Sequence, residues 1–249
     1  MSAGRLIAAF ATALVVVAGL GYAASQTFLG RQPLVVSPQP QYVEAPQPET
    51  RLAKQPDAPS APTKVDPAWV SSMAERAGIP APAVRAYANA QLSEPKGCKV
   101  GWTTLAGIGW VESQHGTIGG RTLGDDGRSS KPVLGPALDG KDFAAIRATP
   151  ESTAWHGDPT WDHAVGPLQF IPSTWETWGA DGDADGVADP NDIDDAAFTA
   201  ARYLCADGHD LTTGAGWADA VFSYNHDQSY VDRVYAAATA YAERTASQR

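Results

Sequence analysis

Basic residues and cysteines are scarce in this 249-residue sequence, and each shortage excludes a class of function. The chain has 18 Lys and Arg against 28 Asp and Glu, a formal net charge of −10. Proteins that bind nucleic acid carry basic faces, so this balance argues against a nucleic-acid partner. Two cysteines alone cannot form a metal site, and the scattered His115, His156 and His163 lack the spacing of zinc ligands.

Regular alternation of apolar and polar residues is also missing, as are internal repeats. The sequence therefore predicts neither a sheet-based fold nor a repeat protein. Hydrophobic residues make up 43% of the chain, which is enough for a core and excludes a wholly disordered protein. Residues 66–249 hold 25 of the acidic residues, 13 of the basic ones and all eight Trp, so the folded part is acidic and rich in Trp.

The N-terminal quarter has a different composition. Arg5 precedes an apolar run over residues 6–24, whose length lies between that of a secretory signal and that of a membrane span. We therefore expect export to the cell envelope, with residues 1–29 either cleaved as a signal peptide or retained as the chain's one membrane anchor. Residues 31–67 contain nine of the 19 prolines, so residues 30–65 are predicted to be a disordered linker.

Residues 66–249 are predicted to form one mainly α domain that acts as a monomer. Asp66-Pro67 and Gly78 are typical of a helix start and stop, and Ser173 with Glu176 fits a capping box. Residues 116–163 are rich in Gly, Asp and Pro and show no clear period. Helices are expected over residues 67–77, 81–92, 102–114, 173–179, 193–206, 217–225 and 229–242. Because an exported domain matures where thiols oxidise, Cys98 and Cys205 are expected to form a disulfide.

Glu112 is the strongest candidate for a catalytic residue. Leu105, Ile108, Gly109 and Glu112 share one helix face, so this carboxyl continues an apolar stripe toward the core. Burial there would raise its pKa, as a general acid near neutrality requires. A surface Glu that flanks the apolar face is the alternative. A second carboxylate is not evident, since Asp126, Asp142, Asp158 and Asp162 all lie in the irregular segment.

Three motifs resemble those of lytic transglycosylases. The string GIGWVESQHG at residues 107–116 is similar to their Glu-Ser motif, AVGPLQFIPSTW at 164–175 to their Gly-x-x-Gln-Phe motif, and SYNHD at 223–227 to their Tyr-Asn motif. The order and the separations also match, and the B-type membrane-bound lytic transglycosylases are the most similar subclass. The resemblance implies a lysozyme-like helical fold, peptidoglycan as substrate and a single catalytic Glu.

The resemblance also implies a mechanism and a set of binding residues. Glu112 would protonate the bond between MurNAc and GlcNAc and then deprotonate the MurNAc 6-hydroxyl, giving a 1,6-anhydro sugar. Gln169 is expected to donate to sugar oxygens beside an apolar wall from Phe170, and Tyr224 to orient Glu112. Asn225 is expected at the helix end, Ser113 in the substrate site, and His115 as a cover of the helix end rather than a sugar contact.

Residues 181–195 form an acidic loop with seven acids and no base. Asp181, Asp183, Asp185 and Gly186 match positions 1, 3, 5 and 6 of an EF-hand, with the Val187 carbonyl as the next ligand. Similarity to the family's stretched, EF-hand-like loop favours Asp195 as the last ligand. Asp192 is the alternative, although it is also placed to cap the following helix. A structural calcium ion is therefore expected, with no organic cofactor.

Two other functions remain open from the sequence. One is a calcium-stabilised peptidoglycan-binding domain without catalysis, and the other is a muramidase that hydrolyses the same bond with water.

Overall fold

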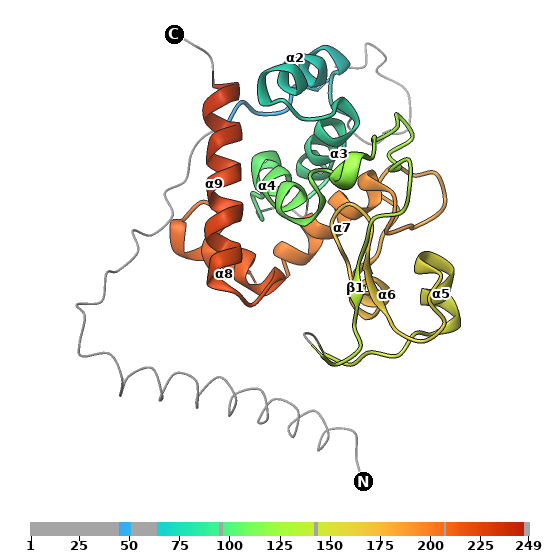
Figure 1. Cartoon of the computed structure of the whole chain (residues 1–249). Coiled ribbons are helices and arrows are strands. Elements are labelled where there is room, and N and C mark those ends of the chain that lie inside the picture. The colour runs from blue at the N-terminus through green and yellow to red at the C-terminus, as the bar shows by residue number, and fades with distance from the viewer. Residues whose placement is uncertain (1–44, 51–63, 95–96, 142–143, 207, 247–249) are drawn as a thin grey trace, which may run out of the picture. The chain divides into compact units, whose positions relative to one another are not determined.

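The computed structural model describes residues 45–50, 64–94, 97–141, 144–206 and 208–246. The predicted export segment lies outside these ranges, and none of the helices within them is long and apolar enough to cross a bilayer. The described residues form a mainly α fold, as predicted (Figure 1). Its helices are α2 (Pro67–Ala77), α3 (Ala81–Leu92), α4 (Trp102–Ser113), α5 (Pro150–His156), α6 (Pro172–Trp178), α7 (Ile193–Leu204), α8 (Gly214–Tyr224) and α9 (Gln228–Thr245).

Helix α4 is the centre of the helical part and packs mainly against α9 and α3. Leu105 and Ile108 are fully buried, as the apolar stripe predicted. A Cβ atom on Gly107 would lie 2.8 Å from the Val234 carbonyl oxygen, so a glycine here allows α4 and α9 to approach closely. Residues 102–109 are buried on all sides, and α4 reaches solvent only in its last turn. The position of Glu112 follows from this arrangement.

The helix ends follow the expected chemistry in two places and differ in one. Asp66 caps α2 by accepting a hydrogen bond from the Ala68 amide, and Gly78 ends it with φ of 71°. Asp192 caps α7 through the Asp194 amide. The predicted capping box of Ser173 and Glu176 is wrong, because α6 begins at Pro172 and no side chain caps it. Proline suits a first helical position, which moves the start one residue earlier.

The segment predicted to be irregular contains short regular elements. Strands β1 (Leu134–Ala137) and β2 (His163–Val165) pair antiparallel, with Leu134 opposite Val165. A 3-10 turn, η1, covers Ile118–Gly120. Helix α5 was missed by the sequence analysis, although Thr149 and Ser152 form a reciprocal capping box at its start. At seven residues α5 is too short to show an apolar period.

Part of the predicted linker belongs to the folded domain. Ala45 is buried, and the Pro46 carbonyl accepts a 2.9 Å hydrogen bond from the Trp102 indole nitrogen. Thr50 pairs with Val65 in an antiparallel bridge. These contacts satisfy the indole N–H at the start of α4, so residues 45–50 are not a solvated tether.

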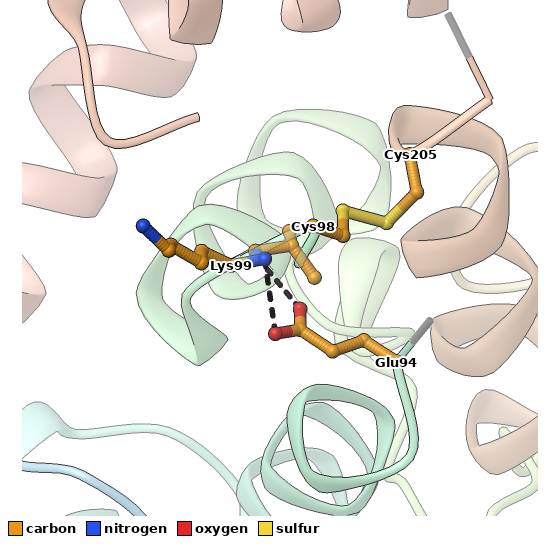
Figure 2. The surroundings of a disulfide bond; sticks show 5 residues. Glu94, Cys98, Lys99 and Cys205 are labelled. Carbon is orange, nitrogen blue, oxygen red and sulfur yellow. Dashed lines mark hydrogen bonds between the residues drawn. A yellow bond between two sulfur atoms is a disulfide. The ribbon is translucent and has the colours of Figure 1, made fainter. Parts of the chain in front are cut away.

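The predicted disulfide between Cys98 and Cys205 is confirmed, with Cα atoms 5.4 Å apart. It joins the loop before α4 to the end of α7 (Figure 2). The Glu94 carboxylate accepts hydrogen bonds of 3.0 Å from the Lys99 amide and 2.7 Å from the Val100 amide. The loop that leads into α4 is thus held by a covalent bond and by a carboxylate.

Candidate active site

Glu112 lies in the last turn of α4, where the helix emerges from the core. Its carboxyl is partly buried and accepts a 2.6 Å hydrogen bond from the Tyr230 hydroxyl on α9. Burial raises the pKa of Glu112 to about 7, while the Tyr230 hydrogen bond and the charge of Arg233 both act to lower it. The pKa of Tyr230 is raised by burial and by the nearby Glu112 charge, so the phenol stays protonated and donates. A carboxyl in this environment can give up and recover a proton near neutral pH.

The cavity in front of Glu112 has a volume of about 340 Å³. Its walls come from β1 and β2, the turn before α6, and helices α4, α6, α7 and α8. The lining residues are Glu112, Pro136, Leu138, Ala164, Gln169, Phe170, Ile171, Thr174, Tyr203, Tyr224 and Asn225. Among these described lining residues, Glu112 is the one carboxylic acid.

The predicted role of Tyr224 as the direct orienter of Glu112 is corrected by the structure. The Tyr224 hydroxyl donates to the Leu168 carbonyl oxygen at 2.8 Å, and Tyr230 makes the hydrogen bond to Glu112. The two tyrosine rings stack with centroids 6.4 Å apart and planes inclined by 4°. Tyr224 thus supports Tyr230 and holds the turn before Gln169. Asn225 follows as the residue that ends α8, and its exposed side chain lines the cavity.

Gln169 reaches the cavity from a tight turn and has a left-handed φ of 51°. Its side-chain nitrogen donates to the Gly166 carbonyl at 2.8 Å and to the Val133 carbonyl at 3.3 Å. Both N–H donors of this amide are thus used within the protein, and the role of Gln169 as a donor to sugar oxygens stays a prediction. The geometry leaves the amide oxygen to accept a hydrogen bond from a ligand. Phe170 is buried at 3% exposure and packs on Trp175 and Tyr224, so it is a core residue with one side toward the cavity.

Ser113 does not contact the cavity. It is fully buried, donates to the Pro167 carbonyl at 2.5 Å and accepts from the Gly116 amide at 2.7 Å. The prediction that Ser113 binds substrate is corrected accordingly: this serine ties the end of α4 to the turn that carries Gln169. Sequence reasoning missed this role because Pro167 lies 54 positions away.

His115 is a core residue behind the site. Its two ring nitrogens lie 3.0 Å from the Tyr87 hydroxyl and 2.9 Å from the Tyr241 hydroxyl. Burial lowers the pKa of His115 to about 3, so the ring is neutral and bridges α3 and α9. Of the two predicted roles, this placement excludes the contact with sugar.

The other acids considered as a second carboxylate lie outside the cavity. Asp162 is buried and binds Ser152 and His156, and Asp158 binds His163 and the turn amides after it. Asp126 is exposed and accepts from the Arg128 amide. Asp142 lies outside the described residues. Asp126, Asp158 and Asp162 therefore provide no partner for Glu112 in an acid-and-nucleophile pair.

The acidic loop brings three of its predicted metal ligands together. Carboxylate oxygens of Asp181, Asp183 and Asp195 all lie within 4.8 Å of one another. Hard oxygen donors of this kind suit Ca²⁺, and these three carboxylates would supply part of the six to eight oxygen ligands that the ion takes. Asp185 lies outside this group and accepts from the Val187 amide at 2.8 Å, and the Val187 side chain is 57% exposed.

Nearby basic residues are bound to other acids of the loop. Arg85 pairs with Asp194 at 2.6 Å, and Arg128 pairs with Asp189 at 2.5 Å and with Asp192 at 3.7 Å. Asp192 is thus engaged by Arg128 and by its capping hydrogen bond. Of the two candidates for the last metal ligand, Asp195 is the one that lies with Asp181 and Asp183. Burial and the charges of Asp183 and Asp181 raise the pKa of Asp195 to about 6. A divalent cation would relieve this repulsion and would hold the loop between α6 and α7.

Comparison with known proteins gives a match over residues 149–234 to the family model described as the transglycosylase SLT domain. The chain carries an SLT-type transglycosylase domain. It is accordingly an enzyme of the lytic transglycosylase type, a class that acts on peptidoglycan. The matched segment includes Gln169, Tyr224 and Tyr230, but it begins after α4 and does not include Glu112. The assignment of Glu112 therefore depends on its hydrogen bond to Tyr230.

Two solved structures of the Escherichia coli lytic transglycosylase Slt35 are also similar. The complex with bulgecin A has 15% identity and a TM-score of 0.44, with 72% of this chain and 79% of that chain covered. The complex with calcium has 16% identity and the same TM-score, with 72% and 80% covered. At this TM-score the likeness does not establish a shared arrangement of the chains. No curated protein sequence matches the chain.

Proposed function

We propose that this domain cleaves the β-1,4 bond between MurNAc and GlcNAc in peptidoglycan and forms a 1,6-anhydroMurNAc end, with Glu112 as the one acid and base. The observation that carries the proposal is a single carboxyl, with a pKa of about 7 and a tyrosine donor, on the wall of a 340 Å³ cavity. The absence of a second carboxylate among the described lining residues fits a reaction that needs one group in both roles.

In this reaction Glu112 gives up one proton and recovers another. Its proton passes to the glycosidic oxygen as the bond from that oxygen to C1 of MurNAc breaks, and the bonding electrons leave with GlcNAc. The carboxylate formed then takes the proton of the MurNAc 6-hydroxyl as that oxygen bonds to C1. Glu112 ends protonated, and no water is consumed. In the intermediate state, the Tyr230 hydroxyl donates to the carboxylate and holds its position.

The other parts of the site have supporting roles in this proposal. The Gln169 amide oxygen would accept from a sugar hydroxyl or acetamido N–H, and Asn225 would contact the glycan at the cavity rim. Calcium held by Asp181, Asp183 and Asp195 would keep the loop after α6 in place without taking part in the chemistry. The B-type subclass, a monomeric state and an exported or membrane-anchored location in the cell envelope remain predictions from the sequence.

Product analysis tests the proposal. Full-length protein incubated with purified peptidoglycan should release anhydro-muropeptides, and Glu112→Gln should lower the rate by about 10²–10⁴-fold, the range of general acid–base catalysis, while sedimented peptidoglycan still binds the variant. Glu176→Gln, an exposed charge change on α6, is the matched control and should act like the wild type.

The alternatives give different products. Reducing ends without the anhydro ring would show a muramidase. Unchanged release by Glu112→Gln would remove Glu112 from the mechanism, and binding without release by the wild type would show a non-catalytic glycan-binding domain.

A further inference from the structure

A second cavity, of about 390 Å³, lies between α4 and α9. Trp110 and Ile118 are among its walls and are 45% and 39% exposed, which places them among the most exposed large apolar side chains of the described residues. The full lining is Trp110, Val111, Gln114, Ile118, Arg233, Ala236 and Ala237. Apolar surface of this kind is open to a ligand rather than packed in the core.

Arg233 provides the positive charge of this cavity. Its side chain is exposed and forms no salt bridge with any described residue, in a domain where acids outnumber bases by 25 to 13. The guanidinium carbon lies 6.0 Å from the centre of the Tyr230 ring, and the Tyr230 hydroxyl binds Glu112. The second cavity therefore lies beside the candidate catalytic group, on the flank of the α4–α9 pair.

We propose that this cavity binds the peptide stem of peptidoglycan, with Arg233 on a stem carboxylate and Trp110 and Ile118 on its small apolar side chains. The inference rests on the proposed function. Guanidinium groups bind carboxylates through two parallel hydrogen bonds, and an exposed indole covers alanine-sized groups at low entropic cost. The net negative charge of the domain disfavours an anionic stem, and Arg233 offsets that repulsion at this cavity.

The reach of the ligand is compatible with this placement. The stem leaves the MurNAc ring through its lactyl group, on the same sugar whose C1 would react at Glu112. An extended peptide gains about 3.3–3.6 Å per residue, so a few residues can pass from the sugar over Tyr230 to Arg233. Stem-bearing glycan would thus bind through two adjoining sites, and a bare glycan through one.

Two substrates separate the stem site from the catalytic site. The full chain would be assayed on peptidoglycan strands with stems and on strands whose stems have been removed by amide hydrolysis. Trp110→Ala is expected to lower kcat/KM on the stem-bearing strands about tenfold, through a higher KM, and to leave the bare strands unaffected. Ile118→Ser should give a smaller loss of the same kind.

Phe222→Ala is the matched control, since Phe222 is 39% exposed on α8 and lines neither cavity. Arg233→Gln should also lower kcat/KM on stem-bearing strands and not on bare strands. This variant is assayed at about pH 5.5, because Glu112 is protonated there both with and without the charge of Arg233.

Equal losses on both substrates, or no loss on either, would overturn the proposal. If the wild type cleaves neither substrate, the proposed function fails instead. Calorimetry with a free synthetic stem peptide then decides the inference: binding that Trp110→Ala weakens and Phe222→Ala does not would support it, and no binding would refute it.

Discussion

Glu112 and the loop of residues 181–195 are both acidic and partly buried, but they are surrounded by different donors. Glu112 receives a hydrogen bond from the Tyr230 hydroxyl. Asp181 receives bonds from the amides of residues 184, 185 and 186, and Asp195 from those of Gly182 and Asp189. The amide bonds hold the pKa of Asp181 below its usual range, but burial and neighbouring carboxylates raise that of Asp195 to about 6. Burial raises the pKa of Glu112 to about 7, against the opposing effect of the Tyr230 hydrogen bond.

The two regions therefore suit different chemistry. A lone carboxyl with a pKa of about 7 can exchange protons with a substrate. Several gathered carboxylates, with nearby arginines bound to other acids, suit a divalent cation. Burial raises the pKa in both regions, so what separates the two uses is the number of carboxylates gathered at one point and the presence of a cavity in front of Glu112.

Calcium removal should give the largest effect on stability, because it takes away the ion that would hold the loop of residues 181–195. At a free calcium concentration 100 times its Kd, binding contributes about 2.7 kcal/mol, so EDTA should lower Tm by about 5–10 °C in scanning calorimetry. Asp195→Asn should abolish this shift, and the exposed Asp126→Asn should preserve it. No change in Tm on chelation, together with no calcium in the purified protein, would remove the metal site from the account.

Glu112→Gln should stabilise the domain in a pH-dependent way. Because the folded state raises the pKa of Glu112 from 4.5 to about 7, the wild type loses stability as pH rises through that interval. Gln does not ionise, so the variant should be more stable by about 2 kcal/mol at about pH 8 and equal near pH 4. Urea denaturation at the two pH values measures this difference. A difference that is the same at both would contradict a raised pKa.

Tyr230→Phe should lower kcat about tenfold, since a hydrogen bond to a charged group is worth about 1.5 kcal/mol or more. That bond holds the pKa of Glu112 down, so its loss should also move the fall of activity, expected near pH 7, to higher pH. The control is Tyr224→Phe, which loses a bond to the Leu168 carbonyl and should not move the pH profile upward. Identical profiles for the wild type and Tyr230→Phe would show that this tyrosine does not act on Glu112.

Ser113→Ala should have the smallest effect, a loss of about 1 kcal/mol in the free energy of unfolding. It leaves the Gly116 amide and the Pro167 carbonyl without their buried partner. Ser173→Ala on the exposed side of α6 should cost less than half of this. Urea titrations of both variants decide whether Ser113 stabilises the contact between the end of α4 and the turn that carries Gln169. Equal losses of stability would contradict that role.

The sequence predicted the features that depend on neighbouring residues. Asp66 and Gly78 bound α2, Asp192 caps α7, and the apolar spacing of α4 placed Leu105 and Ile108 in the core. These are consequences of helical period and terminal hydrogen bonds, which are encoded over a few positions.

Features that depend on distant contacts were not predictable in the same way. Tyr230 meets Glu112 across 118 positions, and no local pattern distinguishes its hydroxyl from that of Tyr224. The two-stranded sheet and α5 are too short to show a period. Part of the cavity wall, including Pro136 and Leu138, comes from β1 and the residue that follows it. A missed signal was the pair Thr149 and Ser152, whose spacing indicates a helix start.

Direct titration of Glu112 tests the central claim most closely. The carboxyl ¹³C resonance that disappears in Glu112→Gln can be followed by NMR from about pH 4 to 9 in full-length protein labelled on its glutamates. The account predicts a midpoint near 7, which shifts upward in Tyr230→Phe. A midpoint near 4.5, the ordinary value for a glutamate, would contradict it.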